Sequence, residues 1–272
     1  MLVLSKCRER RSVTFDEEAW PRLQFEQNPL KVVVAQVRFP TSHALADPAV
    51  HAAIQRAVGD RYPKSLSPVQ EVTYTITPQG PTQAQIERSA IRFSDENEQN
   101  VIAIGSEMVS FETTSYGGWE DFKVEFERLL ELTEEHGVPT EVSRLGLRYV
   151  DELILDDIGG MADLGKVLTD GVLGSPDSLM RDPRVIETTQ RSSIRLEDDV
   201  VSFRHGYVQR VDEGGRETSI YVIDTDIFTV APVRWDLAAL LDRAERYHTW
   251  GTNIFGRSLS RQGIELLGGR ER

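Results

Sequence analysis

Cysteine, long apolar runs and positive charge are all scarce in this sequence. Its one cysteine, Cys7, cannot form a disulfide within the chain. No stretch of about eighteen consecutive apolar residues occurs, so we expect no membrane-spanning helix. The first residues lack the basic stretch followed by an apolar core that marks a secretory signal. These absences favour a cytoplasmic protein.

The charge balance excludes a further class of function. The chain has 31 Lys and Arg against 44 Asp and Glu, a formal net charge of −13. Non-specific nucleic-acid binding is therefore disfavoured, because it depends on basic side chains that neutralise phosphates. The charge leaves room for a local basic surface, and solubility is its simplest consequence.

Motifs of the common catalytic and cofactor sites are also missing. The five histidines show neither H-x3-H nor HExxH spacing, and one cysteine cannot build a thiolate zinc site. Neither a serine-nucleophile elbow nor a phosphate-binding glycine loop occurs. We therefore expect no cofactor. The sequence favours a binding protein over an enzyme, without deciding whether any catalysis occurs.

A few local features remain as chemical candidates, each with a simpler structural explanation. Gly117 and Gly118 precede an expected helix whose free N–H groups could hold an anion, or they simply turn the chain. Basic neighbours would favour the thiolate of Cys7, although a terminal arm rarely supplies a fixed base. Asp151 and Glu152 could contribute to a metal site, but such pairs also arise often in solvated turns.

What the chain does contain is a repeated pattern. The segment R-S-A-I-R-F at Arg88–Phe93 returns as R-S-S-I-R-L at Arg191–Leu196, 103 residues later. The other matches are Gln36–Phe39 with Gly146–Tyr149, Phe111 with Phe228, and Trp119 with Trp235, at offsets of 110 and 116–117 residues. Insertions in surface loops would explain the drift in offset. The pattern predicts one supersecondary unit used twice.

Periodicity and breakers predict the elements of these units. We expect helices at 48–58, 119–136, 161–168 and 236–250, with a further helical segment after Gly251. Strands are expected at 32–39, 71–77, 88–93, 101–104, 108–113, 141–155, 185–196, 200–210 and 219–230. Residues 78–86 are predicted to be a loop, and Asp224–Asp226 could split the last strand.

The predicted fold is α+β, an internal duplication of a β-α-β4-α unit. A largely antiparallel curved sheet carries its helices on one face, a layout that resembles the saddle of TATA-binding proteins. We predict an N-terminal arm (1–28), a first repeat (29–137), a second repeat (138–258) and a helical tail (259–272).

Several motifs resemble a sporadically distributed family of uncharacterised bacterial proteins. They are the strand R-L-G-L-R-Y at Arg144–Tyr149, the helix start Y-G-G-W at Tyr116–Trp119, and His248 with Phe255 in the C-terminal helix. The resemblance covers most of residues 29–267. It implies the fold and a bacterial origin, and patchy distribution suits defence or mobile loci. It implies no activity.

Arginines gather at equivalent positions of the expected strands. If the apolar side of each strand packs on helices, the two-residue period places these arginines on the opposite face. They are Arg38, Arg88, Arg92, Arg144, Arg148, Arg191 and Arg195. One interpretation is an anion site, in which Arg92 and Arg195 converge across the pseudo-twofold. The other is structural pairing with Glu71, Glu112 or Glu187.

These observations predict a non-catalytic binding or protein-interaction module, such as a regulatory or antidote component of a bacterial defence or mobile locus. A protein partner or a homodimer is expected. The alternative is a nucleotide- or nucleic-acid-acting enzyme that uses the arginine-rich face, with Asp151 or Glu152 holding a metal.

Overall fold

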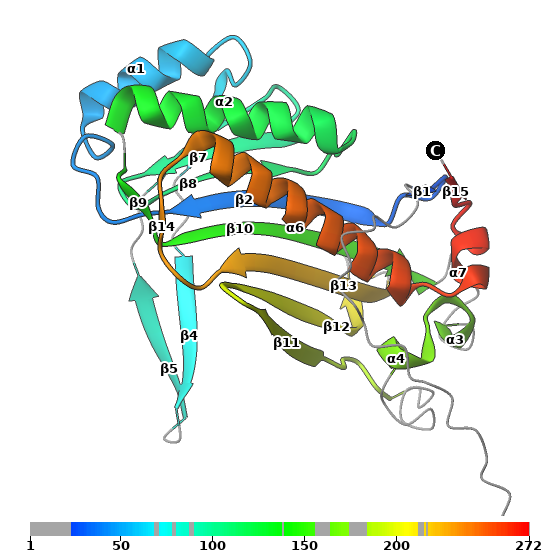
Figure 1. Ribbon diagram of the computed structural model, residues 1–272. Helices are drawn as coiled ribbons and strands as arrows, with labels where there is room; N and C mark the ends of the chain where they lie inside the picture. Colours follow the sequence, from blue (N-terminus) through cyan, green and yellow to red (C-terminus); the bar gives the residue numbers. More distant parts are fainter. Residues whose placement is uncertain are drawn as a thin grey trace, which may run out of the picture.

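The protein is an α+β fold built on one large antiparallel sheet (Figure 1). The computed structural model describes residues 23–67, 71–77, 80–86, 90–137, 139–155, 164–173, 184–211, 215 and 217–271. The sheet has nine strands in the order β11-β12-β13-β10-β2-β8-β7-β6-β3, and every neighbouring pair is antiparallel. This confirms the predicted fold class.

Most strands of the sheet agree with segments predicted from the sequence. The exceptions are residues 64–66, which were not predicted as a strand, and the strand predicted at 185–196, which begins only at Gln190. The bounds of the strands are β2 Leu30–Arg38, β3 Lys64–Leu66, β6 Ala90–Ser94, β7 Asn100–Gly105, β8 Met108–Thr113, β10 Arg144–Ile154, β11 Gln190–Leu196, β12 Asp199–Val211 and β13 Glu217–Thr229. In β2 and β10 buried residues alternate with partly exposed ones along most of the strand. One side of each strand therefore faces the core and the other faces away from it.

Apart from the short edge strand β3, the sheet order is symmetrical about β2 and β10. From Gln36 on β2, successive ladder partners outward are Ser110, Ala103 and Arg92. Gln36 faces Gly146 on β10. The same steps from Gly146 lead through Phe228 and Val200 to Arg195. The hydrogen-bond registers thus place Arg92 and Arg195 at equivalent positions, as the sequence match implies, while descent from a duplication stays a prediction.

The predicted match between Phe111 and Phe228 is wrong. Phe111 lies in the hydrophobic core, whereas Phe228 faces the other side of the sheet, where the guanidinium of Arg144 lies 4.6 Å from its ring centre. The register places Phe228 at the position of Ser110, one residue away from that of Phe111. A one-residue shift moves a side chain to the opposite face of a strand.

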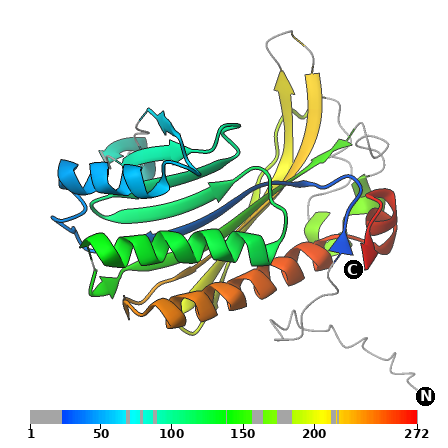
Figure 2. The ribbon, with the colours of Figure 1, turned by 90° about the horizontal axis from the view of Figure 1, so that it is seen from above.

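Three long helices cover one face of the sheet, α1 (Pro48–Val58), α2 (Trp119–Gly137) and α6 (Leu237–Ser258) (Figures 1 and 2). Asp47 caps α1 as predicted, because its carboxylate accepts from the Ala49 N–H at 2.8 Å and Pro48 takes the first helical position. Asp236 caps α6 in the same way, accepting from the Ala239 N–H at 2.9 Å.

Gly251 does not end its helix, contrary to the prediction of a break there. Helix α6 continues to Ser258 because Gly251 serves packing rather than termination. A Cβ atom at this position would lie 2.9 Å from the ring of Tyr149 on β10. The missing side chain therefore lets the helix lie close against the sheet.

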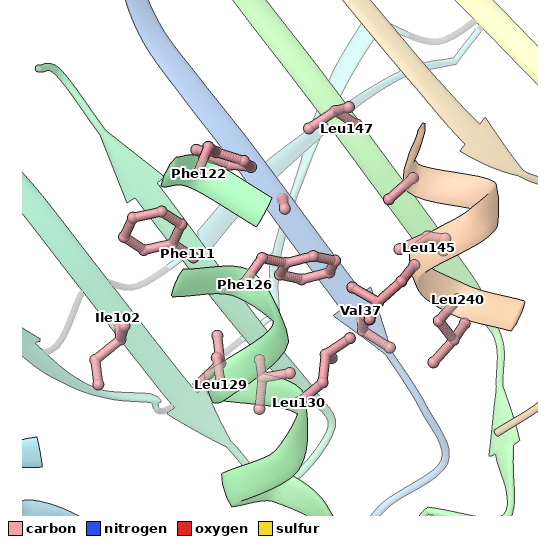
Figure 3. Packing of buried hydrophobic residues seen from close by; sticks show 14 of the residues in the cluster. Val37, Ile102, Phe111, Phe122, Phe126, Leu129, Leu130, Leu145, Leu147 and Leu240 are labelled. Atoms are coloured by element: carbon pink, nitrogen blue, oxygen red, sulfur yellow. The ribbon is translucent and has the colours of Figure 1, made fainter. Parts of the chain in front are cut away.

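The main core lies between this helix layer and the sheet (Figure 3). Phe122, Phe126 and Leu130 of α2 are almost fully buried, at the helical spacing expected from the sequence. From the sheet, Val37, Phe111 and Leu145 meet them. Full burial of such side chains contributes roughly 2 kcal/mol each.

A second, smaller core lies at the other end of the sheet. Its helices are α3 (Leu164–Val167), α4 (Asp170–Leu173) and α7 (Arg261–Leu266). Leu153, Tyr221 and Ile223 of the sheet pack in this cluster together with Leu259. The two ends of the described chain also meet here, since β1 (Leu23–Gln24) pairs with β15 (Arg270–Glu271). Another two-stranded ladder joins β9 (Glu141–Val142) to β14 (Val233–Arg234).

Two predictions about loops are wrong. Residues 80–86 form strand β5 (Gly80–Ile86), which pairs with β4 (Glu71–Thr77) in a hairpin separate from the main sheet. Pairing with β4 satisfies its backbone despite a loop-like composition. Strand β13 is not split at Asp224 and Asp226, which pair with β12 and β10 along an unbroken ladder.

Candidate functional site

The face opposite the helices carries ionic pairs at its centre, and we call it the open face. Arg148 of β10 donates from Nε and one terminal nitrogen to the two oxygens of Asp224, at 2.7 and 2.8 Å. Arg144 donates from one terminal nitrogen to both oxygens of Asp226, at 2.8 and 2.9 Å. The central arginines of the sequence prediction are therefore paired with carboxylates of β13.

Gly146 explains the spacing between these two arginines. A Cβ at Gly146 would overlap the guanidinium of Arg144, so the glycine leaves room for it. That guanidinium also lies over the ring of Phe228, the ladder partner of Gly146, in a cation–π contact at 4.6 Å. The two arginines of the R-x-G-x-R motif thus tie β10 to β13 through their ion pairs with Asp224 and Asp226, and we call this arrangement the clamp.

The same pairing extends across neighbouring strands. Arg204 of β12 donates to Asp224 at 2.6 Å, so this carboxylate, only 7% exposed, holds two guanidinium groups. Arg210 of β12 donates to Glu152 of β10 at 2.5 Å. Asp224 raises the pKa of Arg148 further through its hydrogen bond. The centre of the open face is therefore close to neutral although it is rich in arginine.

Arg38 lies directly opposite Arg144 on the ladder, where two like charges would repel. The side-chain oxygen of Gln36 lies between them and accepts from Arg38 at 2.6 Å and from Arg144 at 3.4 Å. Asp226 offsets the second charge. Arg38 thus belongs to the same central network.

The outer arginines differ from the central ones. Arg191 and Arg195 are exposed on β11, and Arg92 is half-buried on β6. Within the described ranges none of the three forms an ion pair, and Glu112 and Glu187 contact none of them. Arg88 lies outside the described residues, and so does the side chain of Glu71.

Arg92 and Arg195 do not converge on one small site. Six strands separate β6 from β11 in the sheet. At about 4.8 Å per strand the two arginines lie roughly 34 Å apart along the sheet. A mononucleotide could contact only one of them, whereas an extended chain could reach both. The prediction that Arg92 and Arg195 converge on one site is therefore wrong.

Asp151 and Glu152 point to opposite faces and cannot share a metal ion. Glu152 lies on the open face with Arg210, whereas Asp151 is buried among the helix-side residues. Burial, and secondly the charge of Asp224, raise the pKa of Asp151 to about 8. In the part of the chain that the structure describes, no group of three or more His, Cys, Asp or Glu could hold a metal.

The motifs that carry the family resemblance meet on the helix side, around Tyr149. The Tyr149 hydroxyl lies 2.9 Å from Nδ1 of His248 on α6. The His248 ring stacks on Trp119 of α2 at 4.4 Å and 3°. Tyr116 contacts Tyr149 edge to face at 6.4 Å. Phe255 is elsewhere, against Phe25 at 5.9 Å.

The same two helices are linked by reciprocal hydrogen bonds. Trp119 at the start of α2 donates from its indole nitrogen to Glu245 of α6 at 2.7 Å. Trp235, just before α6, donates to Glu134 of α2 at 2.8 Å. Burial raises the pKa of Glu245, but hydrogen bonds from Trp119 and Lys123 lower it overall. The aromatic motif residues thus hold two helices and a strand together.

One pocket of 590 Å³ lies beside this cluster, between the Tyr116–Gly118 segment, the first turns of α2 and Tyr62. Its size suits a small molecule. At its rim Glu125 accepts from Arg61, from Arg128 at 2.8 Å and from the Tyr62 hydroxyl at 3.0 Å. None of the arginines predicted from the sequence lines it.

Gly117 and Gly118 border this pocket, and their geometry has a structural reason. Gly118 has a φ of +149°, a conformation that side-chain-bearing residues rarely adopt. The pair therefore turns the chain from β8 into α2. Cys7 lies outside the described residues.

The carboxylates Asp224 and Asp226 were missed as functional partners of the arginines. Their sequence signal was present, because Ile223, Thr225 and Ile227 alternate with them as in a strand. Opposite charges on two strands that pair would then have suggested the clamp.

Comparison of the chain with protein-family models and with curated proteins gave no match. The family resemblance stays a prediction. Among the described helices, none has the length and apolar character needed to cross a membrane.

Proposed function

We propose that this protein is a non-catalytic binding module whose open sheet face holds a protein partner. The observation that carries the proposal is the contrast between the two faces. Helices cover one face of the sheet (Figure 1). The other face presents a hydrogen-bonded array of arginines and carboxylates. Arginine-rich, hydrogen-bonding surfaces are typical of protein interfaces.

The chemistry of this face favours protein over nucleic acid. Phosphate binding draws on unpaired basic side chains, but Arg144, Arg148 and Arg204 already contact carboxylates. The net charge of −13 acts in the same direction. Burial raises the pKa of Asp151 and Tyr149, which lie in the core, and burial also raises the pKa of Tyr62, which lines the pocket.

The family resemblance suggests the biological setting, which we propose as a regulatory or antidote role in a bacterial defence or mobile locus. A toxin, nuclease or ATPase encoded beside the gene would support that setting. A homodimer through the open face is the other form that such a partner could take.

The test uses two matched charge reversals. Glu112 lies on the open face in the same ladder row as Arg148, with β2 between their strands, and Glu131 is exposed on α2 in the helix layer. Tagged wild-type protein, Glu112→Arg and Glu131→Arg are purified from the native host, and bound protein is quantified. We expect a stoichiometric partner with wild type and Glu131→Arg that is lost with Glu112→Arg. Retention by Glu112→Arg, or loss only with Glu131→Arg, would contradict the proposal.

The nucleic-acid alternative draws on Arg92 and Arg195, which occupy equivalent positions and pair with no described carboxylate. A filter-binding screen at low salt with nucleotides and short single-stranded RNA or DNA tests it. Binding that weakens as salt rises and disappears in the Arg92→Met/Arg195→Met variant would favour this alternative. Equal results for wild type and variant would remove it.

A further inference from the structure

The two edges of the main sheet are unequal. Strand β3 at one edge has only three residues, and short edges are a common protection against unwanted pairing. Strand β11 at the other edge has seven residues, and among the described strands it is paired only with β12. The β11 edge is therefore the longer template for an added strand.

The backbone of β11 offers hydrogen-bonding groups on its outer side. Just before it, Thr188 N–H donates to Tyr207 at 2.9 Å and Gln209 N–H donates to Ile186 at 3.0 Å. These bonds direct even-numbered residues of this segment towards β12. Because an antiparallel ladder alternates, Arg191, Ser193 and Arg195 direct their N–H and C=O groups outward.

Strand β11 is firmly held although no described strand pairs with its outer side. Ile194 and Leu196 pack against the main core from the helix-covered face. Arg191, Ser193 and Arg195 are exposed on the open face. A buried face fixes the register of a strand, so these three side chains keep fixed positions relative to any added strand.

The positive charge of Arg191 and Arg195 indicates which kind of segment this edge would bind. Arg191 and Arg195 lie four residues apart on one face and form no ion pair with a described residue. In an added strand, the residues opposite them on the same face are also four apart. Carboxylates at those two positions would meet the guanidinium groups at cross-strand distance.

We infer that the outer edge of β11 binds an extended segment of the partner protein, with acidic side chains at positions i and i+4. The inference rests on the proposed function and names the surface and the chemistry of the partner. A second copy of this chain fits less well. Antiparallel self-pairing about Ser193 would set Arg191 of one copy opposite Arg195 of the other, and like charges in that position repel.

Two short peptides test this on the full chain. Both alternate valine with polar residues, and they carry either two glutamates or two lysines four positions apart. Fluorescence anisotropy should show that the glutamate peptide binds at least about tenfold more tightly, because two cross-strand charge pairs change sign. The Arg191→Glu/Arg195→Glu variant should reverse the preference, whereas Arg246→Glu on the exposed side of α6 should not change it.

A backbone variant separates strand pairing from simple charge attraction. Ser193→Pro removes an outward N–H while sparing the ladder to β12, since proline is tolerated where a strand edge faces solvent. It should abolish binding of the glutamate peptide with no change in the circular dichroism spectrum. In wild type the peptide should also slow hydrogen exchange of the amides of residues 191, 193 and 195, a readout that needs no variant.

The inference is overturned if neither peptide binds, if both bind equally, or if the amides stay unprotected. If the protein self-associates without peptide and Ser193→Pro abolishes that association, the occupant of the edge is a second copy of this chain and not a partner protein. Tighter binding of single-stranded nucleic acid than of the glutamate peptide would overturn it as well. A stoichiometric partner that is lost with Glu112→Arg but retained by Ser193→Pro would refute the edge alone and leave the proposed function standing.

Discussion

The arginines of the open face divide into an inner and an outer set. The inner set, Arg144, Arg148 and Arg204, lies on β10 and β12 and holds Asp224 and Asp226 of the strand between them. The outer set is Arg92 on β6 with Arg191 and Arg195 on β11, where no described carboxylate meets them. The same residue type thus stabilises the sheet at its centre and is left for solvent or a partner nearer its edges.

Burial explains why the two sets differ. Asp224 is 7% exposed, and a carboxylate so placed needs cationic or hydrogen-bonding partners. Arg191 and Arg195 are exposed, so water satisfies them and no carboxylate is needed to fold the chain. An arginine that folding does not require is the better candidate for binding.

A neighbouring acid shows what the inner pairing achieves. Asp151 lies on β10 beside Val150, the ladder partner of Asp224, but on the helix-covered face. Burial raises its pKa to about 8. Burial is therefore compensated differently for two acids on adjacent strands. Asp224 is paired with arginines, whereas Asp151 has a raised pKa, which favours its protonated form.

The largest predicted effect is that of Asp151→Asn at high pH. Because burial raises the folded-state pKa to about 8, above the usual 3.8 of an aspartate, this carboxyl costs no stability below about pH 4. Stability is then lost as the pH rises towards 8. Asn cannot ionise, so the variant should gain about 3–5 kcal/mol relative to wild type between pH 4 and pH 9. Urea unfolding at several pH values measures this.

Asp242, an exposed carboxylate on α6, provides the control, and Asp242→Asn should leave the pH dependence unchanged. A parallel pH profile for wild type and Asp151→Asn would show that Asp151 is ionised in the folded protein at neutral pH.

The same substitution at Asp224 should have the opposite sign. Asp224→Asn removes the charge that Arg148 and Arg204 share and should destabilise the protein by about 2 kcal/mol at neutral pH. The cost is lower than for a fully buried pair because the two guanidinium groups are 44% and 54% exposed. Urea unfolding measures this loss of unfolding free energy. A stabilising effect would contradict the claim that the inner arginines stabilise the sheet.

Tyr149→Phe tests the contact between β10 and α6 on the helix-covered face of the sheet. Loss of the 2.9 Å contact with His248 should cost about 1 kcal/mol of unfolding free energy. Tyr207→Phe should cost less, because the contact that it removes, between the Tyr207 hydroxyl and Ser219, is longer at 3.2 Å. Equal losses in thermal unfolding would mean that the Tyr149–His248 contact has no special structural role.

The smallest effect is expected for the outer set. Arg92→Met/Arg195→Met should change the unfolding free energy by no more than about 0.5 kcal/mol, as for most surface substitutions. A loss above about 1 kcal/mol in urea unfolding would indicate that these arginines have structural partners after all.

Local patterns were sufficient to predict most elements of the fold. The Asp47–Pro48 helix start and the alternation of β8 carry their own signals, so α1 and β8 have the predicted bounds. The match of Arg92 with Arg195 agrees with the ladder because both strands keep the same register relative to the centre. The order of the strands in the sheet depends on pairing between distant segments, and the sequence did not predict it.

The site was harder to predict, because charge pairing depends on register. The arginines could be placed on one face by periodicity, but their partners Asp224 and Asp226 resembled turn residues. Only the pairing of β13 with β10 and β12 brings them opposite Arg148 and Arg204. Gly251 was misread for a similar reason, since its role depends on Tyr149, which is distant in sequence.

The central claim is that inner arginines hold the sheet and outer arginines hold the partner. The most direct test compares Arg148→Met with Arg195→Met, measuring both unfolding free energy and affinity for the glutamate peptide. We predict that Arg148→Met lowers stability by about 1–2 kcal/mol with affinity unchanged. Arg195→Met should weaken the peptide by about threefold or more with stability unchanged. Similar losses of stability in both variants, or of affinity in both, would contradict the account.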